Sequence, residues 1–380
     1  MTKAPLKYVR PRIESIEGSL EALNADALLV LTPAQKGYLS GITTGIGISP
    51  SGGILMTAPG SPNIYLTSGT DYALCEEQLR GSGYDVVPHY PGKGGSLARG
   101  LARVAVDLRI RSIAVDSGSL TISLYDELCN EMKSVNVDLI TTDSNIVDQL
   151  REVKDNWELE QIRKASEISC RAFERVLGMI KPGLTEWEIA TELEHSIKRD
   201  GYGSHRLAFR PVVVSGARTA FPHGAPTNRR LETGDLVTID FGATWNGYCC
   251  DITRTFGVGS VTDKQRHIYE VVARSQRLAI DQIRPGARRM DVADMALAVI
   301  KEYNLQDNIA HGPGGHGIGI EVHEGPRVRS SGTWVSGNII TVEPGLYFPG
   351  WGGVRIEDDI HITETGKERI TELTRELLVI

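Results

Sequence analysis

The stretch "TIDFGATWNGYCCDITRTFGVG", residues 238–259, decides the fold of the second part of the chain because its pattern indicates a tight β-hairpin. Asn-Gly is a preferred dipeptide of the two-residue type I′ turn, and a turn at Asn246-Gly247 sets the register of the flanking strands. That register places Asp240 opposite Thr253. Since side chains alternate between the faces of a strand, Asp240 and Asp251 become diagonal neighbours on one face.

The two aspartates have two interpretations at this point. They are polar residues on the solvated face of an ordinary hairpin, or they are half of a metal site. Two carboxylates without a cation would repel each other in a partly buried sheet, whereas two metal ions bridged by a carboxylate, about 3.5–4 Å apart, would make their spacing favourable. The hairpin alone leaves both interpretations open.

The second part of the chain also repeats itself at an offset of 103 residues. Two pairs of segments align at this offset: "IKPGLTEWEIATELEHSIK" (180–198) with "IRPGARRMDVADMALAVIK" (283–301), and "GDLVTIDFGA" (234–243) with "GNIITVEPGL" (337–346). Asp240 thereby aligns with Glu343. Helix stops at Pro-Gly are common, but a strand ending in an acid in the same register is much less expected by chance. We therefore predict two pseudo-equivalent halves that each offer a carboxylate to one shared site.

The later segment "TVEPGLYFPGWGGVRIEDDIHIT" (341–363) supplies the second arm of this site. Glu343 ends its first strand and Glu357 lies in the strand that follows a longer, Gly-rich turn. Taken alone, Glu357 would be a charged residue on an edge strand. Its place opposite Asp251 in the repeat favours an acid that points into the site.

The segment "HGPGGHGIGIEVHEGPRV" (311–328), before this second arm, contains three histidines among six glycines. His316 and His323, with His223 in "FPHGAP", flank the four acids, and neutral imidazole is a good ligand for divalent first-row metals. The four carboxylates carry a charge that two divalent ions would neutralise, whereas a bare cluster could not stay ionised in a pocket. Water bridging two such ions becomes a hydroxide nucleophile near neutral pH. This chemistry predicts hydrolysis of an amide or similar carbonyl bond.

The bulk properties fit a two-domain enzyme. The 380 residues predict an α/β domain over 1–150, where helical periods alternate with short apolar runs. They also predict an α+β domain over 151–380 that starts with a long amphipathic helix within 148–180.

A net charge of −7 without basic runs makes nucleic acid an unexpected partner. The five cysteines lack framework spacing, and neither a signal peptide nor an apolar run of about 18 residues is evident. We expect a cytoplasmic protein that does not bind membranes.

These residues resemble the pita-bread metallopeptidase family, which includes prolidase, aminopeptidase P, methionine aminopeptidase and the creatinase-like amidinohydrolases. The resemblance covers nearly the whole chain, from a creatinase-like amino-terminal domain through "LREVKDNWELEQIRKA" to "RIEDDIHITETG". All five positions of the family's metal-binding pattern are present, in "DFG", "DITRTF", "GHGIG", "VEPG" and "RIED": Asp240, Asp251, His316, Glu343 and Glu357. The resemblance implies two divalent ions, Mn²⁺ or Co²⁺ in the first place and Zn²⁺ or Fe²⁺ as alternatives, and a homodimer.

The resemblance also implies roles for residues that surround the metals. His223 and His323 would assist the tetrahedral intermediate and proton transfer, and Glu343 would be the general acid/base. The family usually has a substrate-side histidine four residues before the metal histidine, whereas position 312 is Gly here. His311, five residues before His316, takes this place if one residue has been inserted.

The choice within the family depends on fewer signals. Methionine aminopeptidases usually lack the amino-terminal domain, and creatinase-type members have lost the metal ligands. Arg327, in "HEGPR", stands where prolidase-like members carry an arginine that can pair with the free carboxylate of a dipeptide. This favours an Xaa-Pro dipeptidase over an Xaa-Pro aminopeptidase. The alternative is a member that hydrolyses a C–N bond of a small non-peptide metabolite. Arg355, in "GVRIED", is expected to orient a ligand carboxylate and not to contact substrate.

Overall fold

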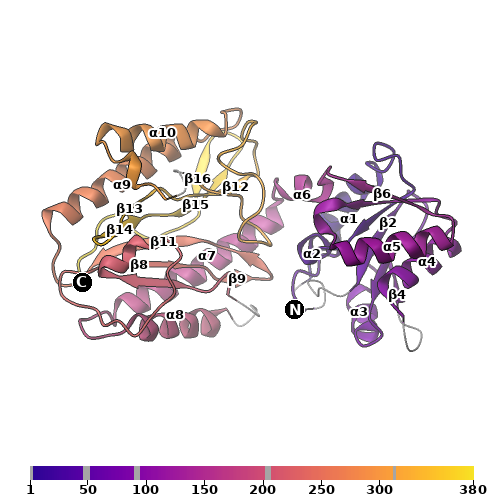
Figure 1. Cartoon of the computed structure of the whole chain (residues 1–380), viewed down its shortest axis with the longest axis horizontal. Helices are drawn as coiled ribbons and strands as arrows, with labels where there is room; N and C mark the ends of the chain where they lie inside the picture. The colour runs from indigo at the N-terminus through magenta and orange to yellow at the C-terminus, as the bar shows by residue number, and fades with distance from the viewer. Residues whose placement is uncertain (1–2, 46–51, 90–94, 202–206, 311–313) are drawn as a thin grey trace. The chain divides into compact units, whose positions relative to one another are not determined.

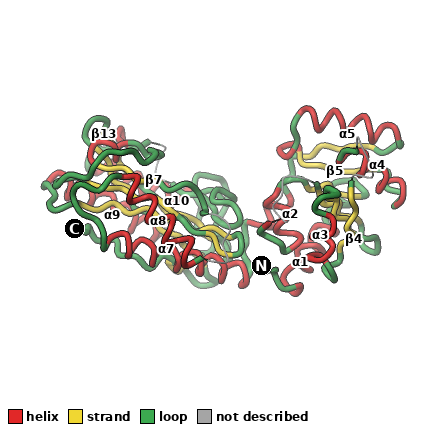
Figure 2. The backbone as a smooth tube through the Cα atoms, turned by 90° about the horizontal axis from the view of Figure 1, so that it is seen from below, coloured by secondary structure: helices red, strands yellow, loops and turns green. Residues whose placement is uncertain are grey.

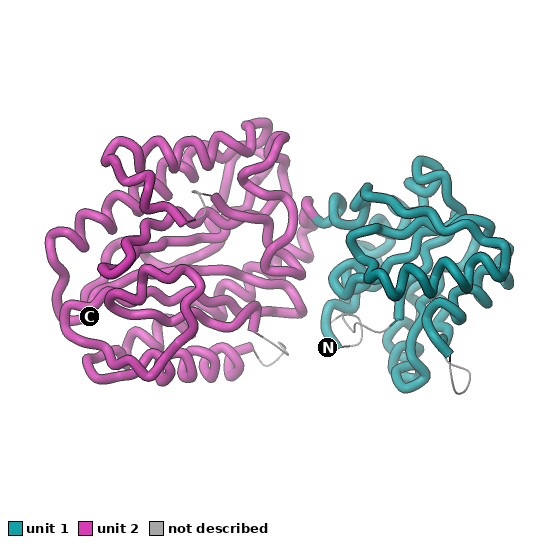
Figure 3. The backbone as a smooth tube through the Cα atoms, in the orientation of Figure 1, with its two compact units in different colours: residues 1–151 teal, residues 152–380 magenta. Residues whose placement is uncertain are grey.

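The computed structural model describes residues 3–45, 52–89, 95–201, 207–310 and 314–380. The chain divides into two compact units, residues 1–151 and 152–380 (Figure 3). None of the helices in the described ranges is both long enough and apolar enough to cross a membrane. Each unit has its own hydrophobic core and is described by itself below.

The first unit is a mixed six-stranded sheet flanked by helices (Figure 1). Its strands have the order β4-β3-β2-β1-β5-β6 and are β1 (Ala27–Val30), β2 (Gly53–Thr57), β3 (Asn63–Thr67), β4 (Tyr84–Pro88), β5 (Ser112–Asp116) and β6 (Asp138–Thr142). Its helices are α1 (Leu6–Glu17), α2 (Pro33–Ser40), α3 (Tyr72–Leu79), α4 (Leu97–Asp107), α5 (Ile122–Ser134) and α6 (Ile146–Arg151). In α4, the buried residues Leu101, Ala102 and Ala105 recur at helical spacing and join the core of the sheet.

The second unit begins with two capped helices. The long helix expected within 148–180 is interrupted: α6 ends at Arg151 and α7 (Asn156–Leu177) begins only after Asp155. The interruption has a local cause, because the Asp155 side chain accepts from the amides of Trp157 and Glu158 while the Glu158 side chain caps the Asp155 amide. A second capping box of Thr185 with Glu188 starts α8 (Glu186–Asp200).

Among the described residues, the rest of the second unit is formed by a second pair of helices, two three-stranded sheets and two short two-stranded sheets (Figure 2). One sheet has the order β11-β8-β7 and comprises β7 (Val212–Ser215), β8 (Leu236–Phe241) and β11 (Ile252–Gly257). The other has the order β12-β15-β16 and comprises β12 (Ile339–Val342), β15 (Asp358–Ile362) and β16 (Lys367–Arg369). The remaining elements are α9 (Asp263–Asp281), α10 (Met290–Glu302) and the short strands β9 (Thr244–Trp245), β10 (Tyr248–Cys249), β13 (Gly345–Phe348) and β14 (Gly352–Arg355).

The predicted register of the first hairpin is confirmed. Asp240 pairs with Thr253 in the β8–β11 ladder, and Trp245 pairs with Tyr248 at the turn. The turn residues Asn246 and Gly247 have φ values of 47° and 81°, as a type I′ turn requires. The turn therefore places the two aspartates as the sequence predicts.

The internal repeat is present in the structure, but its second arm has a different register. β8 and β12 begin 103 residues apart, at Leu236 and Ile339. The second ladder pairs Val342 with Asp358 and Gly345 with Arg355, a register in which Glu343 faces Glu357 directly. Glu357 thus takes the ladder position of Thr253, and the prediction that it stands in the place of Asp251 is wrong. The segment from Glu343 to Glu357 is three residues longer than that from Asp240 to Asp251: one extra residue lies in the β13–β14 turn, and the other two place Glu357 two ladder positions farther from its turn than Asp251.

Candidate metal centre

Two adjoining cavities in the second unit contain the residues predicted for the site. One, of about 650 Å³, is lined by all five predicted metal ligands and by His223 and His323. The other, of about 540 Å³, shares His316, His323 and Glu343 with the first and adds Arg327. The structure therefore brings together every predicted site residue that it describes. His311 lies outside the described residues.

The four acids lie at or next to strand ends of the two arms. Asp240 is in β8, Asp251 directly precedes β11, Glu343 directly follows β12, and Glu357 directly precedes β15. His316 comes from a separate segment that lies along β12. Its carbonyl accepts from the Thr341 amide at 2.8 Å, and its amide donates to the Thr341 hydroxyl at 3.1 Å. Backbone pairing therefore fixes His316 beside the acids.

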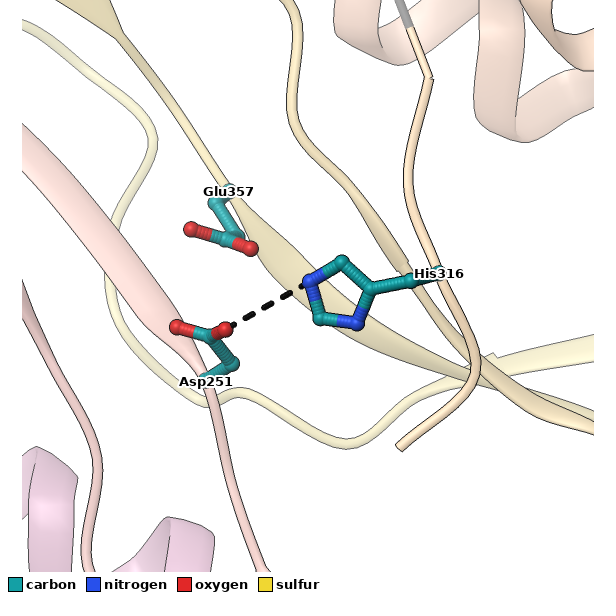
Figure 4. Close-up of side chains that lie close together, drawn as sticks. All are labelled: Asp251, His316 and Glu357. Atoms are coloured by element: carbon teal, nitrogen blue, oxygen red, sulfur yellow. Dashed lines mark ion pairs between the residues drawn. The ribbon is translucent and has the colours of Figure 1, made fainter. Parts of the chain in front are cut away.

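Three donor atoms approach one another closely at the centre of the site. One ligand atom each of Asp251, His316 and Glu357 lies within 4.8 Å of the others, and the three side chains point toward one another (Figure 4). His316 Nε2 is 3.6 Å from Asp251 Oδ2 and 3.4 Å from Glu343 Oε1. The Gly317 carbonyl is 3.1 Å from His316 Nδ1. A proton on Nδ1 leaves the lone pair of Nε2 facing the carboxylates, the arrangement of a metal-ligating histidine.

The raised pKa values of the buried acids favour a bound cation. Burial raises the pKa of Asp251 well above its usual value, and the charges of Glu357 and Asp240 raise it further. Burial also raises the pKa of Glu357 and of Glu343, and the neighbouring carboxylates add to both shifts. Metal ions would remove this mutual repulsion, because their positive charge favours the ionised carboxylates.

The hydrogen bonding of the acids also favours bound metal ions. Within the described residues, one buried oxygen each of Asp240, Asp251 and Glu357 accepts no hydrogen bond. A buried carboxylate oxygen without a partner is unfavourable unless a ligand satisfies it. Burial lowers the pKa of His316 and of His323, so both imidazoles stay neutral and able to bind an ion near neutral pH. The donor set therefore suits divalent metal ions.

Arg355 contacts a ligand carboxylate, as the sequence predicts. Its guanidinium pairs with Asp240 Oδ2, and both side chains are largely buried. It also donates to the Tyr347 hydroxyl and the Pro222 carbonyl, each at 3.1 Å. These contacts fix Asp240 through one oxygen and leave its other oxygen facing the cavity.

Sequence reasoning missed Thr253 and most of the cavity wall. The Thr253 hydroxyl donates to Glu357 Oε2 at 2.6 Å and accepts from Arg355 Nε at 2.9 Å. A signal was available, since Thr253 faces Asp240 in the predicted register and therefore lies on the face of the acids. For the wall residues Phe209, Val212 and Ile320, which line the larger cavity, the sequence carries no comparable signal.

Comparison with known proteins agrees with this geometry. A model of metallopeptidase family M24 matches residues 160–364, and a model of the creatinase/prolidase N-terminal domain matches residues 12–153. The Xaa-Pro dipeptidase of Pyrococcus furiosus is 34% identical over 372 residues, which cover 97% of this chain and 100% of that protein.

Two solved structures are similar over nearly their whole length. The Xaa-Pro dipeptidase from Bacillus anthracis has a TM-score of 0.88 and 33% identity, with 98% of this chain and 100% of that chain covered. The X-Pro aminopeptidase from Thermotoga maritima has a TM-score of 0.85 and 30% identity, with coverage of 97% and 99%. The predicted fold, a pita-bread domain preceded by a creatinase-like α/β domain, is confirmed.

The family implies divalent metal ions, which the donor set suits. The chain belongs to metallopeptidase family M24 and is a metal-dependent peptidase with a creatinase/prolidase amino-terminal domain.

Proposed function

We propose that this peptidase is a dinuclear Xaa-Pro dipeptidase. The observation that carries the proposal is the convergence of the five predicted metal-ligand side chains in one cavity, with Arg327 lining the cavity that adjoins it. Relatives named Xaa-Pro dipeptidase support the substrate class. Asp240, Asp251, His316, Glu343 and Glu357 would hold two divalent ions, with Mn²⁺ or Co²⁺ expected first. Such ions would supply activation of water and polarisation of the scissile carbonyl.

The remaining chemistry falls to the side chains around the ligands. The Glu343 side chain is 28% exposed, compared with 7% for Asp251 and 13% for Asp240, so its carboxylate is the one most open to the cavity. This exposure suits Glu343 to accept a proton from the attacking water and pass it on. His223 and His323 line both cavities, where they would stabilise charge that develops on the substrate oxygen.

Arg327 supplies the selectivity for dipeptides in this proposal. Its guanidinium is exposed in the smaller cavity, and no ion pair holds it among the described residues. In a dipeptide, the residue after the scissile bond carries the free carboxylate, whereas in a tripeptide that residue is joined to the next one by a peptide bond. A bidentate pair with that carboxylate would orient the dipeptide across the ligand set.

The proposal is tested by kinetics on Xaa-Pro dipeptides and on Xaa-Pro-Yaa tripeptides, before and after removal of metal by a chelator. The expected result is hydrolysis of dipeptides that is abolished by the chelator and restored by Mn²⁺, Co²⁺ or Zn²⁺. Full activity of metal-free protein would overturn the metal-dependent mechanism. Metal-loaded protein that cleaves no proline peptide would instead favour a C–N bond of a small non-peptide metabolite. Light scattering tests the homodimer that we expect from the family.

A further inference from the structure

One short loop carries His323 and also contacts the predicted metal ligand His316. In this loop, residues 321–325, the imidazole of His323 lies edge-on against that of His316 with ring centroids 4.2 Å apart. The backbone of Val322 hydrogen-bonds to the side chain of His316. The position of the loop therefore sets both the place of His323 in the cavity and part of the environment of His316.

Glu324 holds this loop in two ways. Its backbone exchanges two hydrogen bonds with Gly317, the residue after His316, at 3.0 and 3.1 Å. Its carboxylate forms an ion pair with Lys154, with Nζ 2.8 Å from Oε1. The two side chains are 1% and 5% exposed, so the pair is almost fully withdrawn from water. Glu324, the residue after His323, thus contacts both the segment of His316 and Lys154, which is distant in the sequence.

The lysine end of the pair has a fixed place. The amide of Lys154 donates to the Gly337 carbonyl at 2.8 Å, and the following residue, Asp155, caps α7. Glycines lie against the Glu324 and Glu152 carboxylates on both sides of this loop. A Cβ on Gly319 would come within 2.2 Å of the Glu324 carboxylate, and one on Gly325 would come within 2.7 Å of the Glu152 carboxylate. The loop therefore contacts Glu152 and Lys154, at the start of the second unit, on the side away from His316.

We propose that the buried Lys154–Glu324 ion pair is a positioning device for His323 in the reaction. The inference rests on the proposed function, because it assigns His323 a part in the peptidase reaction. A buried ion pair is weak evidence for stability, since desolvation of the two charges offsets their attraction. The pair instead has a geometric effect, because it fixes the backbone on the carboxyl side of His323. Lys154 and Glu324 line neither cavity. Lys154 is a positioning residue and not a catalytic one.

The experiment combines Lys154→Met with His323→Ala in a kinetic cycle. Lys154→Met alone should lower kcat at least tenfold and change KM less than about threefold. If Lys154 acts through His323, adding Lys154→Met to His323→Ala should lower kcat less than twofold further. Losses that multiply in the double variant would show a general structural role and overturn the inference. Lys154→Arg, which keeps the cation, should restore kcat to within about threefold of the parent.

Controls separate positioning from loss of folding. Arg229→Met breaks the partly buried Arg229–Asp235 pair, whose residues line neither cavity, and should leave kcat unchanged at a temperature where all variants are folded. If Lys154→Met does not fold, Glu324→Gln removes the same charge pair from the other side. Mass spectrometry of bound metal should give the same content in all of these variants. A metal loss in Lys154→Met that accounts for its lower kcat would overturn the inference.

A structural measurement distinguishes this inference from the proposed function. Crystal structures of the parent and of Lys154→Met should differ at residues 321–325, with the His316–His323 ring separation increased in the variant. If the parent cleaves no Xaa-Pro peptide but the loop moves in the variant, the proposed substrate is wrong. The effect of the ion pair on the position of the loop is then still supported. An active parent with an unmoved loop and unchanged kcat in the variant would defeat the positioning inference alone.

Discussion

The Thr253 hydroxyl donates a 2.6 Å hydrogen bond to Glu357, and the Glu357 amide donates to the Thr253 carbonyl at 3.1 Å. This contact joins the two arms of the repeat at equivalent ladder positions, one in β11 and one directly before β15. The carboxylate of a predicted metal ligand is therefore oriented by the opposite arm of the site. Its orientation depends on the packing of the two arms against each other.

Replacement of Thr253 by Val should weaken metal binding while it preserves the shape of the side chain. Glu357 and Arg355 both lose a buried partner, and the expected loss of stability is about 1–3 kcal/mol. Metal affinity should fall about tenfold or more, as is typical when an outer partner of a ligand is removed. Isothermal titration with Mn²⁺ and urea unfolding measure the two effects. Thr238→Val, whose hydroxyl bonds Thr255 in the same sheet, is the matched control and should retain full metal affinity.

Replacement of Asp251 by Asn should stabilise the metal-free protein and abolish metal-dependent hydrolysis. Burial and the neighbouring Glu357 and Asp240 raise the pKa of Asp251 in the folded state. Its contribution to stability is therefore complete below its unfolded pKa and is lost as pH rises through the higher folded pKa. Near neutral pH the substitution should raise the free energy of unfolding of the metal-free protein, because the variant has no buried charge at this position. Thermal unfolding at pH 5 and pH 7.5 in chelator measures this.

The control for this prediction is Asp200→Asn. Asp200 pairs with Arg175 and Arg171, and these partners lower its pKa despite partial burial. Loss of this charge should leave stability unchanged or lower it at neutral pH. A metal-free Asp251→Asn variant that is less stable than the parent at pH 7.5 would contradict the repulsion argument.

Replacement of Arg327 by Ala should impair the hydrolysis of dipeptides selectively. The lost bidentate pair with the free carboxylate should lower kcat/KM on Xaa-Pro at least tenfold and change it less than threefold on Xaa-Pro-Yaa. Arg329→Ala removes a second exposed arginine of the same cavity and should affect both substrates equally. An equal loss on both substrates with Arg327→Ala would exclude the carboxylate clamp.

Lys36 should make the stability of the first unit depend on alkaline pH. Its side chain is fully buried and donates to the Gly52 carbonyl at 3.2 Å, and burial lowers its pKa from 10.5 to about 8. Because the unfolded state then binds more protons between about pH 8 and 10.5, the free energy of unfolding rises with pH across this window. Lys36→Met should stabilise the unit near pH 7 by up to about 3 kcal/mol, and the gain should disappear by pH 10.5.

This prediction is checked by chemical unfolding of the parent and the variant between pH 7 and pH 10.5. Lys164→Met, which removes an exposed lysine from α7, should show no such dependence. A gain from Lys36→Met that stays constant over the range would show that its cause is packing and not the charge.

Local features of the sequence predicted a large part of the site. The register of the first hairpin follows from the Asn-Gly turn because turn type and strand pairing are coupled over a few residues. The pairing of Asp240 with Thr253 therefore follows from the positions of the turn residues alone. The 103-residue offset likewise identified Glu343, since a repeat of sequence implies a repeat of local structure.

The second arm shows the limit of that reasoning. An offset in sequence does not determine how far along the returning strand an acid lies. Glu357 lies two ladder positions farther from its turn than Asp251 does, and therefore opposite Glu343. Its side chain still reaches the larger cavity because the two arms face each other.

The sequence by itself determined the identity of the donor groups, the face on which the first two lie, and the repeat that joins the two arms. The tertiary structure alone decided that the carboxylate held by Arg355 is that of Asp240, that Thr253 holds Glu357, and that the Lys154–Glu324 pair lies behind His323. The physical reason is range. Turn geometry and strand alternation act between near neighbours in the chain, whereas these buried contacts join residues more than 100 positions apart and form only when distant segments of the chain pack together.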